Sequence, residues 1–387
     1  MKMKKEFPAY IDFAPGEEAD ERYRAWQGCP SIVCTRGGRL FAAWYTGGLY
    51  EPCIHNFNVL VKSDDGGENW TAPILTVKTD EINRIRNIDL QLYLTEENHL
   101  WAMWTRSPYY ADSLPASIKS GEKPNYHKEF YDTEMMLCRD PDAETLVWEL
   151  PRTLCNGFTR NKPVRISTGR LIAPAYGYDA EKYMLRYSDD GGESFYDVAT
   201  VKKPDVRVFD ETMVWEARGR LSMLSRTKRG YYAYSESFDG GESWSEIEEY
   251  EAATGSRFYM GVLRDGALAY VRNVSDTERT GMKLCLSYDG GETFPHTLVL
   301  DTREQVSYPD LCEDGEGNLY IVHDRERDNR RRLDKATWKS EAAKEILVSK
   351  VKREDVQSGI LSAGSFLSRV ISRGGVHTVV DPDETEK

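Results

Sequence analysis

Short runs of apolar and aromatic residues alternate along the chain with polar turns that contain glycine. The stretches LFAAWYTGG (40–48) and LIAPAYGYD (171–179) are typical examples. Runs of this kind, rich in Tyr, Trp and Ala, indicate buried β-strands. The order of strand, glycine turn and strand recurs in 210–228 and 256–273. The pattern predicts a chain built mainly from short antiparallel strands.

An eight-residue word, S-x-D-G-G-E-x-(W/F), occurs four times and marks the turns of a repeat. Its copies are SDDGGENW (63–70), SDDGGESF (188–195), SFDGGESW (237–244) and SYDGGETF (287–294). Consecutive copies start 125, 49 and 50 residues apart, so the first interval has room for a further unit. Ser and Asp oxygens can accept backbone N–H groups, paired glycines supply positive φ, and the closing aromatic residue can enter the core. The word therefore predicts a tight turn between two strands.

One such turn per period, with several short strands between turns, is typical of a β-propeller with four-stranded antiparallel blades. The long first interval is filled by 84–106, which has the strand pattern without the word, and by 137–150, which looks like a copy without its glycines. Six blades in 387 residues would each use about 60 residues, loops included. We predict an all-β, six-bladed propeller in a single domain over residues 1–380, with seven blades as the nearest alternative.

A long segment, 105–132, interrupts the repeat. It is rich in Tyr, Pro and Ser and is too long for a blade turn, and a loop of this length in a compact domain is either functional or mobile. Its aromatic residues can wall a sugar site or can simply anchor the loop to the surface: Tyr109, Tyr110, Tyr126, His127 and Tyr131. Both interpretations stay open.

Three further segments depart from the pattern. Residues 329–346 combine Ala, Lys and Glu with apolar Leu333 and Ile346, which predicts a short helical insertion. The polar and aromatic residues 1–28 are interpreted as a lead-in that supplies the strand closing the ring. The acidic tail 381–387 is predicted to be disordered.

The composition limits the classes of partner. With 51 Lys+Arg against 64 Asp+Glu the net charge is −13, which repels nucleic acid and anionic membrane surfaces. No apolar run reaches membrane-spanning length, and the N-terminal lysines have no apolar stretch behind them, so we expect a cytoplasmic protein. The seven cysteines have neither paired spacing nor a histidine at metal-ligand spacing, so we expect no disulfide framework, metal or cofactor.

The repeated word is the Asp-box, or bacterial neuraminidase repeat, and the chain resembles the sialidase superfamily of six-bladed propellers. In that superfamily the boxes lie on the rim away from the active site. The resemblance covers most of residues 24–360. It implies an active site in the central funnel, which the boxes themselves do not form.

The resemblance implies a catalytic pair, Glu211 and Tyr308. Glu211 is followed fifteen residues later by Arg226, as the family's acidic residue is followed by a substrate-binding arginine. Tyr308, in Ser-Tyr-Pro-Asp, resembles the family's nucleophilic tyrosine. A phenol is a poor nucleophile because its pKa is near 10, so it needs an adjacent base, here Glu211. A surface ion pair and an ordinary tyrosine before proline are the alternatives.

Further candidates follow from position in the family pattern. Arg279, eight residues before the fourth box, resembles a second carboxylate-binding arginine, and Arg257 is the competing candidate. Arginine suits this role because its planar fork gives bidentate hydrogen bonds to a carboxylate. Glu51 lies roughly where sialidases keep a general acid, and His55 is its alternative.

One family residue is missing. Sialidases have Arg-Ile-Pro where this chain has Gly28-Cys29-Pro30, so the first arginine of the three-arginine clamp is a glycine. Arg24 or Arg86 are the candidates to reach the same space. The departure puts the sialic-acid substrate in doubt.

The expected function is therefore an exo-acting glycoside hydrolase that removes a terminal, acidic sugar from an oligosaccharide or glycoconjugate, with retention of configuration. Two alternatives remain open: a carbohydrate-binding propeller without catalysis, and a polysaccharide lyase that uses Tyr308 or a histidine as base. The sequence does not indicate the sugar, the linkage or the oligomeric state.

Overall fold

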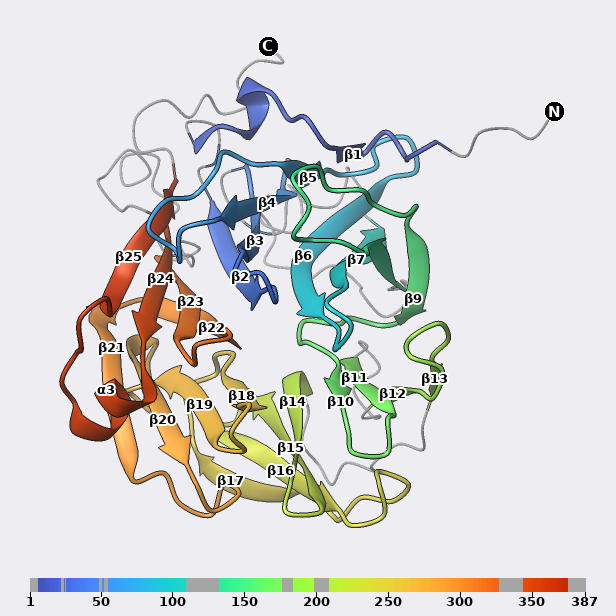
Figure 1. The fold of residues 1–387 in the computed structure, drawn as a ribbon. Coiled ribbons are helices and arrows are strands. Elements are labelled where there is room, and N and C mark those ends of the chain that lie inside the picture. Colours follow the sequence, from blue (N-terminus) through green and yellow to red (C-terminus); the bar gives the residue numbers. More distant parts are fainter. Residues whose placement is uncertain are drawn as a thin grey trace, which may run out of the picture.

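The computed structural model describes residues 6–21, 24, 26–48, 51, 55–108, 132–175, 184–197, 209–326 and 344–374. The described strands form six antiparallel sheets arranged as blades around a central axis (Figure 1). The prediction of an all-β, six-bladed propeller is confirmed. Within the described residues, no helix is long and apolar enough to cross a membrane.

Each blade holds four strands in sequence order, from the axis outward. Blade I consists of β2 (Gln27–Cys34), β3 (Leu40–Thr46), β4 (Phe57–Ser63) and β5 (Leu75–Val77), with β1 (Ile11–Asp12) paired outside β5. Blade II consists of β6 (Ile85–Leu94), β7 (Leu100–Pro108), β8 (Asp132–Cys138) and β9 (Arg152–Asn156). Blade III consists of β10 (Val164–Arg165), β11 (Leu171–Ala175), β12 (Met184–Ser188) and β13 (Tyr196–Asp197).

The other three blades repeat this plan. Blade IV consists of β14 (Phe209–Ala217), β15 (Arg220–Thr227), β16 (Tyr231–Ser237) and β17 (Glu248–Ala252). Blade V consists of β18 (Tyr259–Val262), β19 (Leu268–Asn273), β20 (Thr280–Ser287) and β21 (His296–Glu304). Blade VI consists of β22 (Val306–Glu313), β23 (Leu319–Arg325), β24 (Glu345–Val351) and β25 (Phe366–Arg373).

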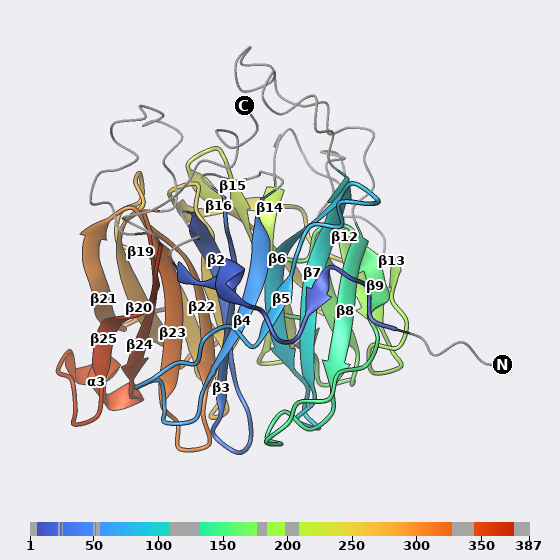
Figure 2. The same cartoon turned by 90° about the horizontal axis from the view of Figure 1, so that it is seen from above.

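Antiparallel order gives the ring two distinct faces, seen from the side in Figure 2. The first strand of each blade starts at one face, and the connection between the second and third strands returns to that same face. We name this the site face. The repeated words connect third and fourth strands, so they lie at the opposite face, which we name the turn face.

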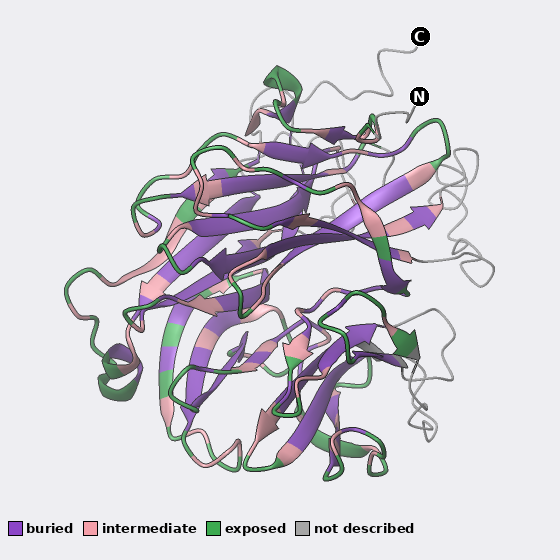
Figure 3. Ribbon diagram, turned by 45° about the vertical axis from the view of Figure 1, so that its right-hand side comes forward, coloured by how far each residue is buried: buried purple, intermediate pink, exposed green. Residues whose placement is uncertain are grey.

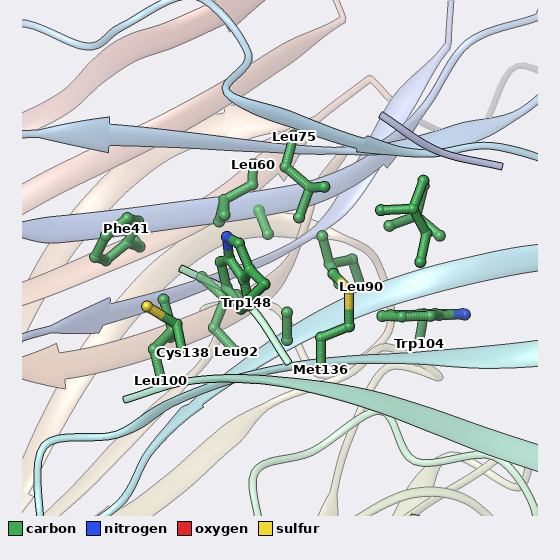
Figure 4. Packing of buried hydrophobic residues seen from close by; sticks show 14 of the residues in the cluster. Phe41, Leu60, Leu75, Leu90, Leu92, Leu100, Trp104, Met136, Cys138 and Trp148 are labelled. Atoms are coloured by element: carbon green, nitrogen blue, oxygen red, sulfur yellow. The ribbon is translucent and has the colours of Figure 1, made fainter. Parts of the chain in front are cut away.

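The core lies between blades rather than inside one of them. Strands β2 and β3 are buried along their whole length, while the outer strand β17 is mostly exposed (Figure 3). Inner strands are covered on both faces by neighbouring blades, which explains their continuous apolar runs. In Figure 4 Trp148 lies beside Leu60 and Leu92, between blades I and II. The segment 137–150 therefore supplies a buried aromatic residue to blade II, whereas the aromatic residues that close the repeated words are partly buried.

The repeated words form the expected hydrogen-bonded turns. In the first copy, Ser63 Oγ donates to Asp65 Oδ1 at 2.8 Å and accepts from Gly67 N at 2.9 Å. Asp65 also accepts from the backbone N–H of Asn69 at 2.9 Å, and these hydrogen bonds, led by that of Asn69, lower the pKa of Asp65 to about 2. The other three copies make the same contacts from Ser188, Ser237 and Ser287. The word thus specifies a turn. The candidate chemical residues lie at the site face, away from these words.

The ring closes differently from the expectation for residues 1–28. Strand β1 pairs with β5 at the outer edge of blade I, and blade VI has all four strands from the C-terminal part of the chain. Hydrogen bonds between blades I and VI contribute to closure: Asp324 of β23 accepts from Cys29 N of β2 at 2.9 Å, and within blade VI it also accepts from Ser307 Oγ at 2.6 Å. The lead-in was therefore wrongly assigned to the closing strand.

The helical prediction over 329–346 fails at its C-terminal end. Residues 327–343 lie outside the described residues, but Ile346 belongs to β24. The run from Ile346 to Val348 is fully buried between β23 and β25, where β-branched side chains favour a strand. The described helices are the 3-10 turn η1 (Glu17–Ala19) and α3 (Arg353–Ser358), which replaces the turn between β24 and β25. Helix α3 starts with Asp355 accepting from Lys352 N and ends at Gly359 with φ of 74°.

The second glycine of the third-blade word provides a test of how these turns pack. Gly192 has φ of 95°, and a Cβ there would overlap the ring of Trp101 in blade II, whereas a Cβ on Gly191, with φ of 76°, would meet nothing within 4 Å. Both alanine variants incur the cost of positive φ, about 1 kcal/mol. We predict that Gly192→Ala lowers the free energy of unfolding by about 1–3 kcal/mol more than Gly191→Ala, because it also overpacks the blade interface. Urea unfolding of both variants checks this, and equal losses would contradict it.

Candidate active site

Four first strands carry a β-bulge near their start at the site face. In each, two residues lie opposite one residue of the second strand: between Gly28 and Ser31, Ile88 and Gln91, Phe209 and Thr212, and Ser307 and Asp310. The bulged residues Cys29, Asp89 and Tyr308 have φ of 59°, 57° and 55°. A bulge redirects the side chains beside it and is common next to active sites. Bulges in the first strands of four blades therefore lie at the same end of the axis.

Glu211, Arg226 and Tyr308 meet at this end. Arg226 Nη1 donates to Glu211 Oε2 at 2.7 Å and to the Tyr308 hydroxyl at 3.0 Å. Glu211 belongs to β14, Arg226 to the end of β15, and Tyr308 to the bulge of β22. All three side chains are buried. The structure thus brings together the predicted glutamate, arginine and tyrosine, with the guanidinium as the group that touches both others.

Arg279 lies over the other part of Tyr308. Its guanidinium carbon is 5.7 Å from the centre of the Tyr308 ring, a cation–π distance, and its Nη2 donates to Gly255 O at 3.2 Å. Arg279 comes from the connection between β19 and β20, which belongs to the site face. Two of the predicted arginines therefore flank the predicted nucleophile.

Two site residues were not selected from the sequence, Asp89 and Arg160. Arg160, in the link between β9 and β10, donates from Nε to Asp89 Oδ2 at 2.6 Å and from Nη1 to Glu211 Oε1 at 3.2 Å. Asp89 occupies the bulge of β6 and is buried. An acidic residue inside the mostly apolar stretch IDLQLYL was the available signal for Asp89. Arg160 has no such signal, because it lies in a link without periodicity.

The six residues Asp89, Arg160, Glu211, Arg226, Arg279 and Tyr308 form the site cluster. Glu211 is fully buried, and burial alone would raise its pKa. The guanidiniums of Arg226 and Arg160 outweigh this burial and hold the pKa of Glu211 well below its ordinary value of 4.5. Glu211 is therefore a carboxylate over the whole neutral range.

Arg257, the competing candidate for Arg279, lies deeper on the axis. It is only 1% exposed, and its Nε donates to Asn161 Oδ1 at 3.0 Å. Its Nη1 reaches Pro30 O at 3.4 Å, and its Nη2 is 3.9 Å from Asp310 Oδ1. These contacts link Arg257 to three other parts of the ring. They indicate that Arg257 stabilises the packing of the blades rather than binding a substrate.

Arg24 and Arg86, the candidates to replace the arginine absent at Gly28, have other partners. Arg24 donates to Gln27 Oε1 at 3.4 Å and lies 5.6 Å from the Trp44 ring centre, and its burial lowers its pKa to about 10. Arg86 donates to Ser107 Oγ of β7 at 3.0 Å. The third guanidinium of the site cluster, beside those of Arg226 and Arg279, is that of Arg160.

Glu51 and His55 lie in the connection between β3 and β4, at the site face. Glu51 is partly buried and His55 is exposed. The loop aromatics predicted to wall or anchor the site lie outside the described residues: Tyr109, Tyr110, Tyr126, His127 and Tyr131. Within the part of the chain that the structure describes, no group of three or more His, Cys, Asp or Glu side chains could hold a metal ion.

The chain has detectable relatives in sequence and in structure. A family model described as BNR repeat-like domain matches residues 122–321. No match was found among curated proteins. The intramolecular trans-sialidase from Ruminococcus gnavus, solved with oseltamivir carboxylate, aligns with a TM-score of 0.67 at 18% identity, covering 88% of this chain and 97% of that one.

Two other solved structures show the same likeness. The leech intramolecular trans-sialidase, complexed with 2,7-anhydro-Neu5Ac, aligns with a TM-score of 0.68 at 16% identity, covering 88% of this chain and 70% of that one. Hadza microbial sialidase Hz136 aligns with a TM-score of 0.62 at 16% identity, covering 79% of this chain and 64% of that one. At these identities the likeness concerns the fold.

The charge pairing of Glu211 generates a pH-dependent prediction. Its folded pKa lies below its unfolded value, so the stability from this pairing is fully present above about pH 4.5 and is lost as the pH falls towards the folded pKa. We predict that Glu211→Gln lowers the free energy of unfolding at pH 7 by about 3 kcal/mol, because the buried guanidinium of Arg226 and the partly buried guanidinium of Arg160 each lose an ionic partner. The deficit should shrink below about pH 4.5.

Urea unfolding of both proteins at pH 7 and at a series of acidic pH values measures this. Glu248→Gln, a change at an exposed position on β17, is the control for loss of a surface charge. A deficit that stays constant across the pH series would contradict the prediction.

Proposed function

Because the chain belongs to the family of BNR repeat-like domains and has a sialidase-like fold, we propose that it is an exo-acting glycoside hydrolase for a terminal acidic sugar. The observation that carries the proposal is the contact of Arg226 with both Glu211 and the Tyr308 hydroxyl. It supports Tyr308 as the nucleophile of a retaining reaction, with a covalent sugar intermediate on its oxygen.

The charge of the substrate explains why a tyrosine would serve. Most retaining glycosidases use an Asp or Glu nucleophile, and enzymes with a tyrosine are exceptions. A carboxylate on the anomeric carbon repels a charged nucleophile at close range but does not repel a neutral phenol. The phenol then loses its proton as it attacks, and in the proposal Glu211 accepts it as Arg226, which otherwise lowers the pKa of Glu211, turns its donor to the charged phenol oxygen. Arg226 supports this step because a donor at the phenol oxygen favours the charged form.

The remaining steps need an acid for the leaving group. In the proposal Glu51 gives its proton to the oxygen of the leaving sugar, and His55 is the alternative donor in the same connection. Water, deprotonated by the same residue, then attacks the anomeric carbon. The bond to Tyr308 breaks, and the phenol recovers its proton from Glu211. Arg226 and Arg279 hold the carboxylate of the sugar.

Tyr308→Phe is the decisive variant. It removes the nucleophilic oxygen and little else, so hydrolysis of 4-methylumbelliferyl glycosides of acidic sugars should fall at least about 10³-fold, to the level left by binding and electrostatics alone. Binding of the acidic product, measured by isothermal titration calorimetry, should stay within about threefold. A fully active Tyr308→Phe protein, or a wild-type enzyme that prefers a neutral sugar, would sink the mechanism. Binding without turnover in the wild type would favour a carbohydrate-binding propeller, and an unsaturated product absorbing in the ultraviolet would favour a lyase.

The two competing arginines should respond to substitution in opposite ways. Arg279→Met removes a cation beside Tyr308 and should raise KM for an acidic glycoside about tenfold or more, with the free energy of unfolding nearly unchanged. Arg257→Met leaves Asp310 with one cation fewer in a buried position and should lower the free energy of unfolding by about 3 kcal/mol. Kinetics and urea unfolding of both variants measure this. The assignment is reversed if Arg257→Met folds normally and shows the larger rise in KM.

A further inference from the structure

Arg160 and Asp89 are the two residues of the site cluster that have no part in the proposed chemistry, and Arg160 is the one that contacts the catalytic glutamate. It reaches the site from the link between blades II and III and contacts one carboxylate of blade II and one of blade IV. Its guanidinium carbon also lies 5.1 Å from the centre of the Phe158 ring. The guanidinium therefore has a defined position, and it is more exposed than either carboxylate it binds.

The two carboxylates present a problem for an acidic ligand. Asp89 and Glu211 are each only 1% exposed, and Asp89 Oδ1 has no hydrogen-bond partner among the described residues. Buried carboxylates repel an incoming carboxylate strongly, because the surrounding dielectric is low. Among the described hydrogen bonds, Arg226 binds one of these two carboxylates, that of Glu211. Arg160 binds both of them.

Counting charges shows what Arg160 contributes. The site cluster contains three guanidiniums, of Arg160, Arg226 and Arg279, and two carboxylates, of Asp89 and Glu211. Its net charge is therefore positive with Arg160 and zero without it. Since the chain as a whole carries a net charge of −13, this local excess of positive charge is what an anionic ligand would encounter at the site.

We propose that Arg160 is a positioning residue that makes this site selective for acidic sugars, because it binds Asp89 and Glu211 together and cancels the repulsion of the second carboxylate. The inference rests on the proposed function and adds the source of its charge selectivity. It also assigns a role to Asp89, which Arg160 fixes in the site.

The test compares an acidic ligand with its neutral ester. The ligands are 2,3-didehydro-2-deoxy-N-acetylneuraminic acid and its methyl ester, and the dissociation constant of each is measured by isothermal titration calorimetry. We expect wild-type protein to prefer the acid. Arg160→Gln should reduce this preference about 10- to 100-fold, through weaker binding of the acid, while binding of the ester changes little. Arg160→Lys should keep most of the preference, because it keeps the charge.

A double variant separates charge from general disturbance of the fold. Arg160→Gln with Asp89→Asn removes one cation and one anion together, so the site cluster regains its net positive charge. We expect it to recover the preference for the acid to within about threefold of wild type. It also avoids the unpaired buried carboxylate that threatens the folding of Arg160→Gln alone. Arg165→Gln, five residues further along, is the matched control because Arg165 pairs with Glu96 and Glu97 at the turn face.

The outcomes distinguish this inference from the function on which it rests. If wild-type protein prefers the acid and Arg160→Gln prefers it equally, or if the double variant prefers it no more than Arg160→Gln does, the role of Arg160 is overturned and the proposed function stands. If wild-type protein binds neither ligand, or prefers the ester, the acidic-sugar function is overturned and this inference with it.

Discussion

The buried carboxylate of Asp310 on the axis is the interaction on which the arrangement of the blades depends. Its Oδ2 accepts from Ser31 Oγ at 2.8 Å and from Ile32 N at 2.9 Å, both in blade I, and from Lys162 Nζ at 2.9 Å. Lys162 in turn donates to Ile32 O and Leu311 O, so one side chain from between blades II and III spans the axis to blades I and VI. A buried carboxylate is costly unless it is paired and hydrogen-bonded, so these contacts hold the first strands in one relative position.

This polar centre has a direct consequence for the site above it. The bulges of β2, β6 and β22 end at Ser31, Gln91 and Asp310, and Arg257 contacts or approaches the last two of these residues. Positive φ at Asp89 and Tyr308 costs free energy and persists only where the surroundings fix it. The buried polar residues Gln91 and Asp310 supply this constraint, because they follow Asp89 and Tyr308 by two residues. The backbone at Asp89 and Tyr308 is thus held by buried residues that lie outside the site cluster, which is an arrangement that favours precise positioning.

The sequence specified the fold more completely than the site, for a physical reason. A turn is a local structure, so the four repeated words carry all the residues their hydrogen bonds need, and Ser63, Asp65 and Gly67 could be read directly. Glu211, Arg226 and Tyr308 could be found because a family pattern supplied their positions. Arg160 and Asp89 are joined across 71 residues by a contact that has no spacing rule. The helix placed over 329–346 failed at Ile346 because burial between two strands outweighs local helix propensity.

Gly28 lies in blade I and Arg160 lies in the link between blades II and III, and the buried carboxylates near these two positions have different partners. At the junction of blades I and VI, the buried carboxylate of Asp324 accepts hydrogen bonds from Cys29 N in blade I and from Ser307 Oγ in blade VI. In the neighbouring blade II, Asp89 lies at the bulge of β6 that corresponds to the bulge at Cys29 in β2, and Arg160 is its ionic partner. The Arg160 guanidinium, between blades II and III, contacts two buried carboxylates, those of Asp89 and Glu211. The positive charge of this site therefore lies where the buried negative charge is, and the acidic group of a ligand would be drawn towards Arg160 and Arg226 rather than towards Gly28.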